Sequence, residues 1–578
     1  MHPWLNNYNK SMIKSKWIFK KGLEREKLLS LSKKWGISPL LIALLHNRGI
    51  AEEDIGKFIH PSLQDLYDPF LMKDMDRAVK RIIKSIRKKE RILIYGDYDA
   101  DGITATSLLL KFLRDLEISG YFYIPHRQSE GYGLNKEAVR KASKKNINLI
   151  ITCDCGISSV EEVEYAYSLG MEVIITDHHR TETPISPKIP VLNPHQPDCN
   201  YPFKGLSGVG VAFKLCQALV QKMGISRDRL NNYLDLVALG TIGDIVPLRE
   251  ENRILVKLGL KMLNGSSLSL GLKALIKLVG LEGKEISERQ VGYILAPRLN
   301  ACGRLSLAKK GVDLILSTTH QQAFRLAREL NKENIYRQRI ERKMCQEVDQ
   351  ILSAGKQDLV ILVAKKGWHP GVVGLVASYI KEKYLRPSLV FSLDGKLARG
   401  SARSIPSFPI FKALEKCEDL LQSFGGHKLA AGITLPVENI EPLRKRLNYL
   451  AHDMLSPEDF SPSYFIDAKV NLDKLNKEMV EELELLAPYG SENSLPLFLA
   501  ERVHLSFPEK IKRGVKLRVS SFEGKEEFEA IGFGLNKEEK FIAQKGIVSV
   551  LYTPRINQYR GEKKIQLEIK NWQGENYE

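Results

Sequence analysis

Cysteine is scarce in this sequence and is never arranged in a paired motif. The 578 residues include seven cysteines, an odd number, and no two of them have the Cys-x-x-Cys spacing. Disulfide frameworks belong mainly to small secreted domains with even cysteine counts, so the sequence excludes that class. We therefore expect reduced thiols and a cytoplasmic protein.

Long hydrophobic runs are also missing from the N-terminal part. The longest clean apolar stretch there is Leu40–Leu45, whereas a membrane-spanning helix needs about 20 apolar residues. The first 22 residues are basic but contain no apolar segment of the kind that a secretory signal requires. We expect a soluble protein with no membrane partner.

Acidic residues are outnumbered by basic ones. The 69 Asp and Glu residues against 87 Lys and Arg residues give a formal net charge of +18 and a pI near 9.3. This excess favours a polyanionic partner, and the lack of a basic amphipathic anchor favours nucleic acid over an acidic membrane surface. A chain of 578 residues is too long for one core, so we expect three or more domains.

Three strand-like apolar runs end at acidic or histidine residues. The runs cover residues 91–95, 148–152 and 172–176. The residues that follow them are Asp97, Asp99, Asp101, Asp154, Asp177, His178 and His179. In an open α/β sheet the carboxyl ends of parallel strands share one edge, so we expect these side chains to meet there.

Carboxylates and imidazoles crowded together need compensating positive charge, which divalent metal ions supply. Two ions about 3.5–4 Å apart form a clamp for phosphoryl displacement, and oxygen ligands with imidazole suit Mn²⁺ or Mg²⁺. The motifs predict a phosphoesterase that uses two such ions. A lone Asp99 would be explained better as the cap of the next helix, but two adjacent histidines have little packing reason to be there.

Two nearby features leave alternatives open. Asp244 lies between glycines and apolar residues in segment 239–247, where a carboxylate needs a partner, so it is either a further metal-site acid or a helix cap. Cys153 and Cys155 flank Asp154. They are either thiolate ligands or, as we favour, small residues at a buried strand end.

The order of the predicted elements indicates an α/β fold. Predicted strands at 91–95, 121–125, 148–152, 172–176 and 190–193 alternate with helical segments, which implies a mostly parallel sheet. Residues 206–310 are predicted to be helical, and 319–353 to form one long helix whose arginines face either solvent or a phosphate backbone. Residues 1–35 show no clear periodicity and are predicted to form an extended arm or packing segment.

A second α/β unit follows, with predicted strands at 358–364 and 387–393. Glycines there stand beside basic and hydroxyl residues, and such sequences allow close backbone approach to an anion. The residues concerned are Arg399, Ser401, Arg403, Gly425, Gly426 and His427. Together they predict a wall that holds the substrate.

The last part, residues 460–578, is predicted to be rich in strands, at 515–521, 528–535, 547–554 and 564–570. Basic and aromatic residues alternate there: Lys516, Arg518, Phe533, Tyr552, Arg555, Tyr559 and Arg560. This composition suits a small barrel that grips single-stranded nucleic acid by stacking and charge. An ordinary β domain with a core of aromatic residues is the alternative.

Several segments together resemble the DHH phosphoesterase superfamily. They are 96–102 (GDYDADG), Asp154 and 177–179 (DHH). Further segments resemble the branch of single-strand-specific DNA exonucleases: 125–127 (PHR), 130–134 (EGYGL), 296–304 (APRLNACGR), 368–374 (WHPGVVG), 425–427 (GGH) and 487–493 (APYGSEN). The resemblance covers roughly residues 38–575, with Cys302 as one departure in a tight turn.

The resemblance implies a domain plan: an N-terminal arm and helical segment (1–80), a mostly parallel-sheet DHH catalytic domain (81–318), a connecting helix (319–353), a DHHA1 domain (354–459) and an OB-fold β-barrel that binds nucleic acid (460–578). It also implies metal ligands, which are Asp99, Asp101, Asp154, His178 and Asp244, with Asp97 in a less defined role. His179 would contact the scissile phosphate. The implied substrate-binding residues are Arg127, Arg298, Arg304, Arg399, Ser401, Arg403, Gly425, Gly426 and His427.

The resemblance further implies digestion of single-stranded DNA from its 5′ end to nucleoside 5′-monophosphates, in recombination and repair. A single-stranded-DNA-binding protein and a helicase are the implied protein partners. Two alternatives are a phosphoesterase of short oligonucleotides, cyclic dinucleotides or pyrophosphate, and a non-catalytic replication scaffold. The basic charge and the C-terminal β region argue against the first alternative, and the complete set of acids and histidines against the second.

Overall fold

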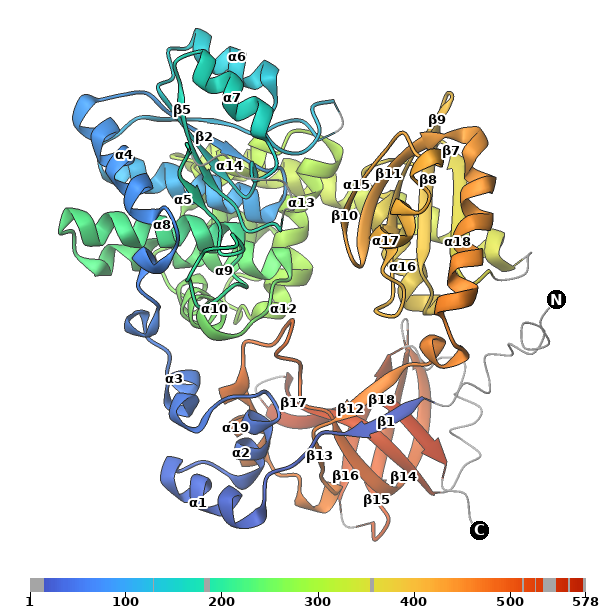
Figure 1. Cartoon of the computed structure of the whole chain (residues 1–578). Helices are drawn as coiled ribbons and strands as arrows, with labels where there is room; N and C mark the ends of the chain where they lie inside the picture. Colours follow the sequence, from blue (N-terminus) through green and yellow to red (C-terminus); the bar gives the residue numbers. More distant parts are fainter. Residues whose placement is uncertain are drawn as a thin grey trace.

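The computed structural model describes residues 15–127, 129–180, 188–353, 358–511, 514–524, 526–533, 547–559 and 562–574. Figure 1 shows a large α/β part, a smaller α/β part beside it, and a β-barrel below both. No single helix in these ranges has the length and apolar character to span a membrane. The bent pair α1 (Arg25–Trp35) and α2 (Pro39–His46) meets that length and composition only when both are taken together.

The large part is built on a parallel sheet with the strand order β3-β2-β4-β5-β6. The strands are β2 (Ile92–Gly96), β3 (Gly120–Tyr123), β4 (Leu149–Cys153), β5 (Glu172–Thr176) and β6 (Val191–Leu192). Alternate residues of β2 face opposite cores, because side chains alternate along a strand. Ile92 and Ile94 pack in the cluster that contains Ile103 of α5, whereas Leu93 packs in the one that contains Val163 of α7.

Helices cover both faces of this sheet. They are α4 (Met75–Lys88), α5 (Ala100–Asp115), α6 (Lys136–Lys144) and α7 (Val160–Ser168). A helical subdomain follows, as predicted for residues 206–310. It comprises α8 (Gly208–Met223), α9 (Leu234–Asp244), α10 (Glu250–Leu263), α11 (Leu270–Leu278), α12 (Glu288–Gln290), a π-helical turn η6 (Val291–Leu295), α13 (Ala296–Leu305) and α14 (Lys309–Ile315).

The long connecting helix α15 (His320–Ser353) forms where the sequence predicts it. Its first half packs Leu326 and Leu330 into the core of the large part. Its second half packs Met344 and Val348 against the second α/β part. The helix therefore belongs to both cores rather than lying free in solvent.

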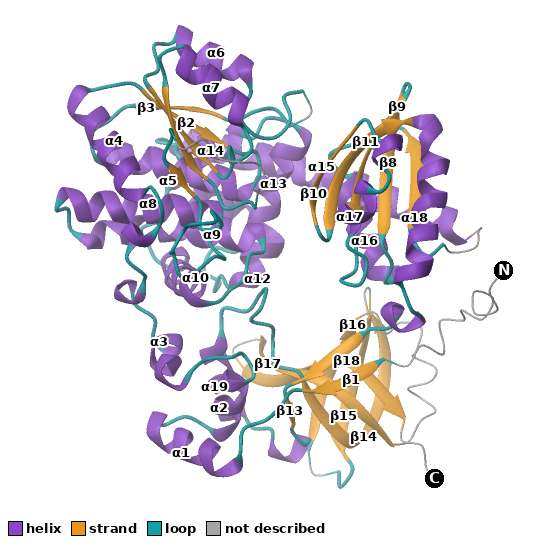
Figure 2. Ribbon diagram, viewed as in Figure 1, coloured by secondary structure: helices purple, strands orange, loops and turns teal. Residues whose placement is uncertain are grey.

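The second α/β part has a five-stranded sheet in the order β10-β11-β9-β8-β7 (Figure 2). Its elements are β7 (Ile361–Lys366), β8 (Ser388–Asp394), β9 (Leu397–Arg403), β10 (Ser423–His427), β11 (Ala430–Pro436), α16 (Val373–Tyr384), α17 (Ile410–Glu415) and α18 (Ile440–Met454). The edge strand β10 lies on the side that faces the large part (Figure 1).

The C-terminal part is a closed barrel, in which β14 pairs with both β15 and β17. Its elements are β13 (Ala468–Lys469), α19 (Lys477–Glu482), β14 (Phe498–Ile511), β15 (Gly514–Ser521), β16 (Glu527–Phe533), β17 (Ile547–Tyr559) and β18 (Glu562–Gly574). The α/β class with parallel sheet, connecting helix, second α/β part and terminal β-barrel is thus confirmed. Strand β14 was not predicted from the sequence.

The prediction that Tyr552 of the barrel stacks on nucleic acid is wrong. Tyr552 is fully buried, and its hydroxyl donates to the carbonyl oxygen of Val470 at 2.9 Å. It is a core residue and cannot stack on a nucleobase. Residues 534–535 of a predicted strand, the side chain of Tyr559 and all of Arg560 lie outside the described residues.

The N-terminal segment packs on the barrel. Strand β1 (Lys16–Phe19) pairs in parallel with β12 (Ser463–Ile466), and α1, α2 and α3 (Ile55–Ile59) join the barrel core. The described residues 15–35 form a packing segment, which was one of the two alternatives for residues 1–35, but helix α1 within them was not predicted. Leu28, Leu31 and Trp35 have the i, i+3, i+7 spacing of a helical stripe, which many surrounding lysines obscure in the sequence.

Candidate metal centre

The loop after β2 presents three aspartates. Asp97 and Asp101 are almost completely buried, at 4% and 1% exposure. Asp99 caps helix α5, because its Oδ1 accepts hydrogen bonds from the backbone N–H groups of Asp101 and Gly102 at 2.9 and 3.1 Å. The helix-cap alternative is therefore true for Asp99, but only one of its two carboxylate oxygens takes part.

Backbone amides at the start of α8 hold Asp101. Its Oδ2 accepts from the N–H of Gly208 at 2.6 Å, and its Oδ1 from the N–H of Val209 at 2.8 Å. Unpaired N–H groups and a positive dipole end make a helix N-terminus a favourable place for a carboxylate. Asp101 is thus fixed by a helix that begins more than 100 residues later in the sequence.

Asp154 follows β4 directly and has a left-handed backbone conformation, with φ of 63°. Aspartate tolerates this region better than most residues do. The turn directs its carboxylate to the edge of the sheet, where Oδ1 lies 3.1 Å from His178 Nε2. Asp154 is also nearly fully buried.

The Asp177-His178-His179 segment follows β5. Asp177 Oδ1 accepts hydrogen bonds from the N–H groups of His178 and His179 and from His179 Nδ1 at 2.8 Å. The hydroxyl of Tyr132 lies 3.0 Å from the same Nδ1 atom of His179. It donates a hydrogen bond to the carbonyl oxygen of Asp154 at 3.1 Å. Because Nδ1 of His179 is engaged, Nε2 is its nitrogen free to meet a substrate.

His178 stands at the middle of the acidic group. Its Nε2 lies 3.1 Å from Asp154 Oδ1, 3.5 Å from Asp244 Oδ2 and 3.9 Å from Asp101 Oδ2. Asp244 is the last residue of α9 and the cap position is Ile245, so Asp244 is not the cap itself, and its carboxylate lies with the other acids. Residues from four separate elements thus meet within a few ångströms.

The pKa shifts at this edge have two opposite patterns. Burial and neighbouring carboxylates raise the pKa of Asp97, Asp101 and Asp154 well above the usual range, and that of Asp244 to about 7. Burial and the charge of His179 lower the pKa of His178 to about 3. For His179, burial opposes the charged form, but the hydrogen bond and charge of Asp177 outweigh it and raise the pKa to about 9.

These side chains fit divalent cations. Three sets have ligand atoms close enough for one ion each: Asp97, Asp99 and Asp154; Asp101, His178 and Asp244; and Asp154, His178 and His179. Asp97 Oδ1, Asp154 Oδ1 and His178 Nε2 are buried and have no hydrogen-bond partner among the described residues. Buried acceptors without donors are costly, and metal ions would satisfy them while removing the repulsion between the carboxylates.

Arginines lie next to the acidic edge, which is the sheet edge formed by Asp97, Asp99, Asp101, Asp154, His178 and Asp244. The guanidinium of Arg127 stacks on the ring of Tyr98 at 4.9 Å. Arg304 donates to the carbonyl oxygen of Gly371 at 3.3 Å and so joins the two α/β parts. Burial and the positive charges of nearby arginines lower the pKa of Arg304 to about 10. These neighbours are Arg127, Arg337 and Arg403.

The second α/β part supplies the opposite wall. The ring of His427 is nearly parallel to that of His179, with centroids 6.4 Å apart. Gly425 and Gly426 precede His427 on the exposed edge strand β10. Arg403 donates to the hydroxyl of Ser401 at 2.9 Å. The structure therefore brings these five predicted residues to the face opposite the acidic edge.

Two predicted arginines lie further away. Arg298 donates to Asn331 Oδ1 of α15 at 3.0 Å and lies beside Arg337. Arg399 lines a separate cavity of about 640 Å³ with Tyr336, Lys343 and Trp368. Neither arginine has a described contact with the acidic edge.

Asp177 was predicted to lie at this edge, but not to orient His179, and Tyr132, Gly208 and Arg337 were not predicted as site residues. Asp177 orients His179, Tyr132 contacts both His179 and Asp154, and Gly208 supports Asp101. Arg337, for which a solvent-facing position was the favoured prediction, has a side chain only 12% exposed and an Nε that is buried without a partner among the described residues. Asp177 and Tyr132 stand inside quoted motifs, whereas no sequence signal pointed to the other two.

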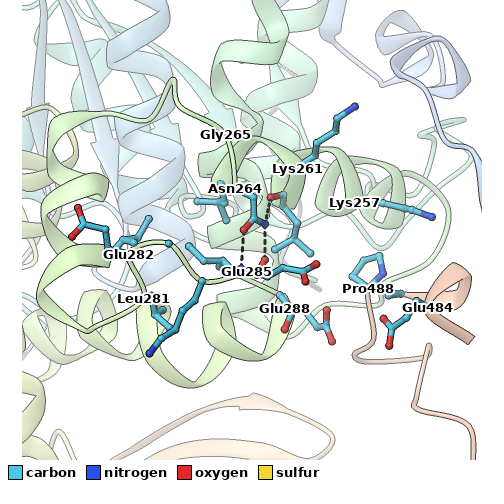
Figure 3. A pocket seen from close by; sticks show the side chains of 18 of the residues that line it. Lys257, Lys261, Asn264, Gly265, Leu281, Glu282, Glu285, Glu288, Glu484 and Pro488 are labelled. Atoms are coloured by element: carbon cyan, nitrogen blue, oxygen red, sulfur yellow. Dashed lines mark hydrogen bonds between the residues drawn. The ribbon is translucent and has the colours of Figure 1, made fainter. Parts of the chain in front are cut away.

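A larger cavity, about 1500 Å³, lies between the helical subdomain and the barrel. Figure 3 shows Lys257 and Lys261 of α10 on one side and Glu285, Glu288 and Glu484 nearby. Asn264 braces this wall through two hydrogen bonds with the backbone of Ile286, at 2.8 and 2.9 Å. The mixed charges make it a polar gap between domains, remote from the acidic edge.

Three domain families match the chain in order. They are the DHH family, N-terminal domain, at residues 91–241, the DHHA1 domain at 356–453, and the RecJ OB domain at 466–571. The single-stranded-DNA-specific exonuclease RecJ of Bacillus subtilis (strain 168) is 41% identical over 555 residues, which cover 95% of this chain and 70% of the relative. The chain belongs to the RecJ family.

Another RecJ and two solved structures agree with this assignment. The single-stranded-DNA-specific exonuclease RecJ of Escherichia coli (strain K12) is 33% identical over 560 residues, or 93% of this chain and 96% of the relative. RecJ in complex with Mn²⁺ from Thermus thermophilus has a TM-score of 0.84 at 28% identity, covering 97% of this chain and 80% of that one. RecJ in complex with Mg²⁺ from the same organism has a TM-score of 0.79 at 27% identity, covering 97% and 79%.

The close approach of α8 to Asp154 gives a first prediction. A Cβ atom on Gly208 would lie 2.6 Å from the Cβ of Asp154, so Gly208→Ala must displace the carboxylate. We expect kcat to fall by about 10- to 100-fold, because small misplacements at a reaction centre cost that much. Gly210→Ala in the same helix is the matched control, since its Cβ would approach only Ser207 Oγ, at 3.2 Å, and the flexible side chain of Leu206. Equal activity of the two folded variants in nuclease assays would contradict the prediction.

Proposed function

We propose that this RecJ-family chain is a metal-dependent exonuclease that hydrolyses single-stranded DNA. The observation that carries the proposal is the buried group of carboxylates and imidazoles with unsatisfied ligand atoms, opposite a wall of arginines. Such a group matches the needs of phosphoryl transfer, in which charge builds on the phosphate oxygens. The proposed cofactor is a pair of Mn²⁺ or Mg²⁺ ions.

The proposed ligands are Asp97, Asp99, Asp101, Asp154, His178 and Asp244. When bound, the ions lower the pKa of a water molecule and neutralise phosphate charge. His178 suits this role because its lowered pKa leaves the ring neutral at neutral pH, and a neutral imidazole can coordinate an ion through one of its nitrogens. Asp99 offers Oδ2, since Oδ1 is committed to the cap of α5. Asp154 belongs to the set with Asp97 and Asp99, and its Oδ1 lies 3.1 Å from Nε2 of His178 in the other set, so its carboxylate would reach both ions.

His179 and the arginines are proposed to bind the phosphate. The raised pKa of His179 keeps the ring protonated near neutral pH, so its free Nε2 would donate a hydrogen bond. Arg127, Arg304 and Arg403 would add guanidinium donors to non-bridging oxygens. Ser401, Gly425, Gly426 and His427 would complete the wall, and Arg298 and Arg399 would contact phosphates further along the strand.

The finer parts of the proposal concern the substrate and partners. We propose 5′-to-3′ digestion that releases nucleoside 5′-monophosphates, in recombination and repair. A helicase, which generates single strands, and a single-stranded-DNA-binding protein, which covers them, are proposed partners. A cytoplasmic location is also proposed. The barrel at 460–578 is proposed to hold the strand beyond the cleft, through residues such as Lys516 and Arg518.

End-labelled digestion tests this function. Single strands with a 5′ or 3′ label, blunt duplex and a dinucleotide are each incubated with Mn²⁺, Mg²⁺ or chelator. We expect metal-dependent release of mononucleotide from the 5′ label of the single strand and little attack on the duplex. Attack on the dinucleotide alone would indicate a small-substrate phosphoesterase, and no hydrolysis with either metal a scaffold protein.

A further inference from the structure

Ile245 has an unusual position and conformation. It directly follows Asp244 at the end of α9, and its φ is 63°, in the left-handed region. A β-branched side chain is strongly disfavoured there, and glycine or asparagine would end the helix at lower cost. The side chain is also 74% exposed, so burial does not compensate for the strain. Folding alone gives no reason for isoleucine at this position.

Tyr293 is a second exposed apolar side chain near the same place. It lies on the π-helical turn η6 and is 79% exposed. π-Helical turns are rare and occur frequently at functional sites. Arg298, a proposed phosphate contact, lies within the next two turns of the same helical run.

Both residues lie on one packed junction beside the metal centre. A Cβ atom on Gly292 would lie 3.5 Å from Ile242 Cγ2, and one on Gly243 would lie 3.3 Å from the Cβ of Ala296. The end of α9 therefore packs directly on η6 and the start of α13. The same Gly243 position would approach the Cβ of Ala100, the residue after Asp99, to 2.9 Å.

We propose that Ile245 and Tyr293 form a shelf on which a nucleobase of the DNA strand stacks, next to the phosphate held at the metal centre. This inference rests on the proposed function. A flat apolar surface matches the face of a base, and stacking of bases on aromatic side chains is the usual way to hold single strands without reading their sequence.

The shelf adds a reason for strand selectivity. Bases in a duplex are paired with the other strand and, except at its ends, stacked on both faces, so an unpaired strand can turn a base onto the shelf more readily. Stacking accepts all four bases, because each has a π face. The shelf would therefore favour single strands over duplex without favouring any sequence.

The first experiment compares Tyr293→Ala with the wild-type enzyme on two substrates. One is an ordinary single strand, and the other carries abasic sites in the nucleotides nearest the 5′ end. On the ordinary strand we expect KM to rise by about tenfold with little change in kcat. On the abasic strand the wild-type enzyme should lose the same factor, and Tyr293→Ala should lose nothing further.

Two further tyrosine variants are controls. Tyr293→Phe keeps the ring and should behave as the wild type does. Tyr449→Ala removes a tyrosine that is 71% exposed on α18 of the second α/β part, and should leave both substrates unaffected. An equal KM rise for Tyr293→Ala on both substrates would overturn the stacking proposal.

Ile245→Gly separates a structural role from a binding role. Glycine relieves the left-handed strain, so we expect a melting temperature equal to or above that of the wild type, together with a raised KM on the ordinary strand only. A lowered melting temperature with unchanged KM would overturn the assignment of Ile245. If the wild-type enzyme cleaves no single-stranded DNA, the proposed function itself fails, and that outcome is distinct from both results above.

Discussion

Replacing Asp154 with asparagine is expected to reduce nuclease turnover by at least about 1,000-fold while the chain stays folded. Asp154 takes part in two of the three sets of candidate ligand atoms, and its Oδ1 is buried without a hydrogen-bond partner among the described residues. Asparagine keeps the shape and one carbonyl oxygen but removes the negative charge, so both ions would be held more weakly and their charge would be compensated less. Single-turnover digestion with Mn²⁺ and with Mg²⁺ measures the loss.

Asparagine is a better replacement than alanine because of the backbone. Asp154 has a φ of 63°, which asparagine adopts more readily than alanine does. Alanine would combine the loss of a ligand with backbone strain, and a fall in activity could then have two causes. Asp198→Ala, at an aspartate whose side chain is 81% exposed in the same part of the chain, is the matched control and should retain full activity.

The same variant should be more stable than the wild type when chelator removes the metal. Folding raises the pKa of Asp154, so the folded chain holds that proton more tightly than the unfolded chain does. Stability due to this group is therefore lost as pH rises above the ordinary carboxyl pKa, near 4. The advantage of Asp154→Asn in thermal melting should grow with pH. Near wild-type activity with either metal would show that Asp154 is not a ligand.

The acidic edge could be predicted from sequence because a topological rule places it. Parallel strands bring their carboxyl ends to one edge, and Asp97, Asp154 and His178 each follow a recognisable apolar strand. The position of Asp244 was harder to predict, because it lies at the end of a helix. No local sequence pattern distinguishes a residue at a helix terminus from a metal ligand. The structure places its Oδ2 3.5 Å from His178 Nε2, which the sequence pattern alone could not predict.

Contacts between distant segments could not be predicted. The sequence around Arg298 and Arg399 does not show which face of the helix or strand meets the cleft. In the structure Arg298 donates to Asn331, and Arg399 lines a separate cavity. Tyr552 has the alternating pattern of a strand, but that pattern does not distinguish the inside of a barrel from the outside. The pairing of β1 with β12 joins residues more than 440 positions apart and leaves no trace in either segment.

That pairing determines the expected effect of removing the barrel. A chain ending at residue 459 is expected to fold poorly, rather than to survive as a weak DNA binder. Leu41, Leu44 and Leu45 of α2 are at most 1% exposed and pack in the same core as Phe498 and Val550. When the barrel is absent, exposure of each of these leucine side chains lowers the free energy of unfolding by about 1.5–3 kcal/mol.

Polar contacts would be lost with that core. Arg253 of α10 is 2% exposed and donates to the carbonyl oxygens of Phe58, Leu485 and Leu486. Lys20 loses its 2.8 Å ion pair with Asp467, whose side chain is 2% exposed. Residues 15–60 would therefore lose the apolar core and the ion pair that hold them to the barrel.

A doubly trimmed chain provides the decisive control. Residues 61–459 lack both the barrel and the segment that packs on it, so we expect this chain to give more soluble protein and a higher melting temperature than residues 1–459. Protease should cut residues 15–60 rapidly in the singly trimmed chain and slowly in the full chain. If residues 1–459 melt as high as residues 61–459 and resist protease at their N-terminus, the shared core does not stabilise the N-terminal segment. In that case, loss of DNA binding by residues 1–459 could be assigned to the missing barrel surface. If the shared core does stabilise the N-terminal segment, DNA binding must instead be compared with residues 61–459, in which the unfolded segment is removed.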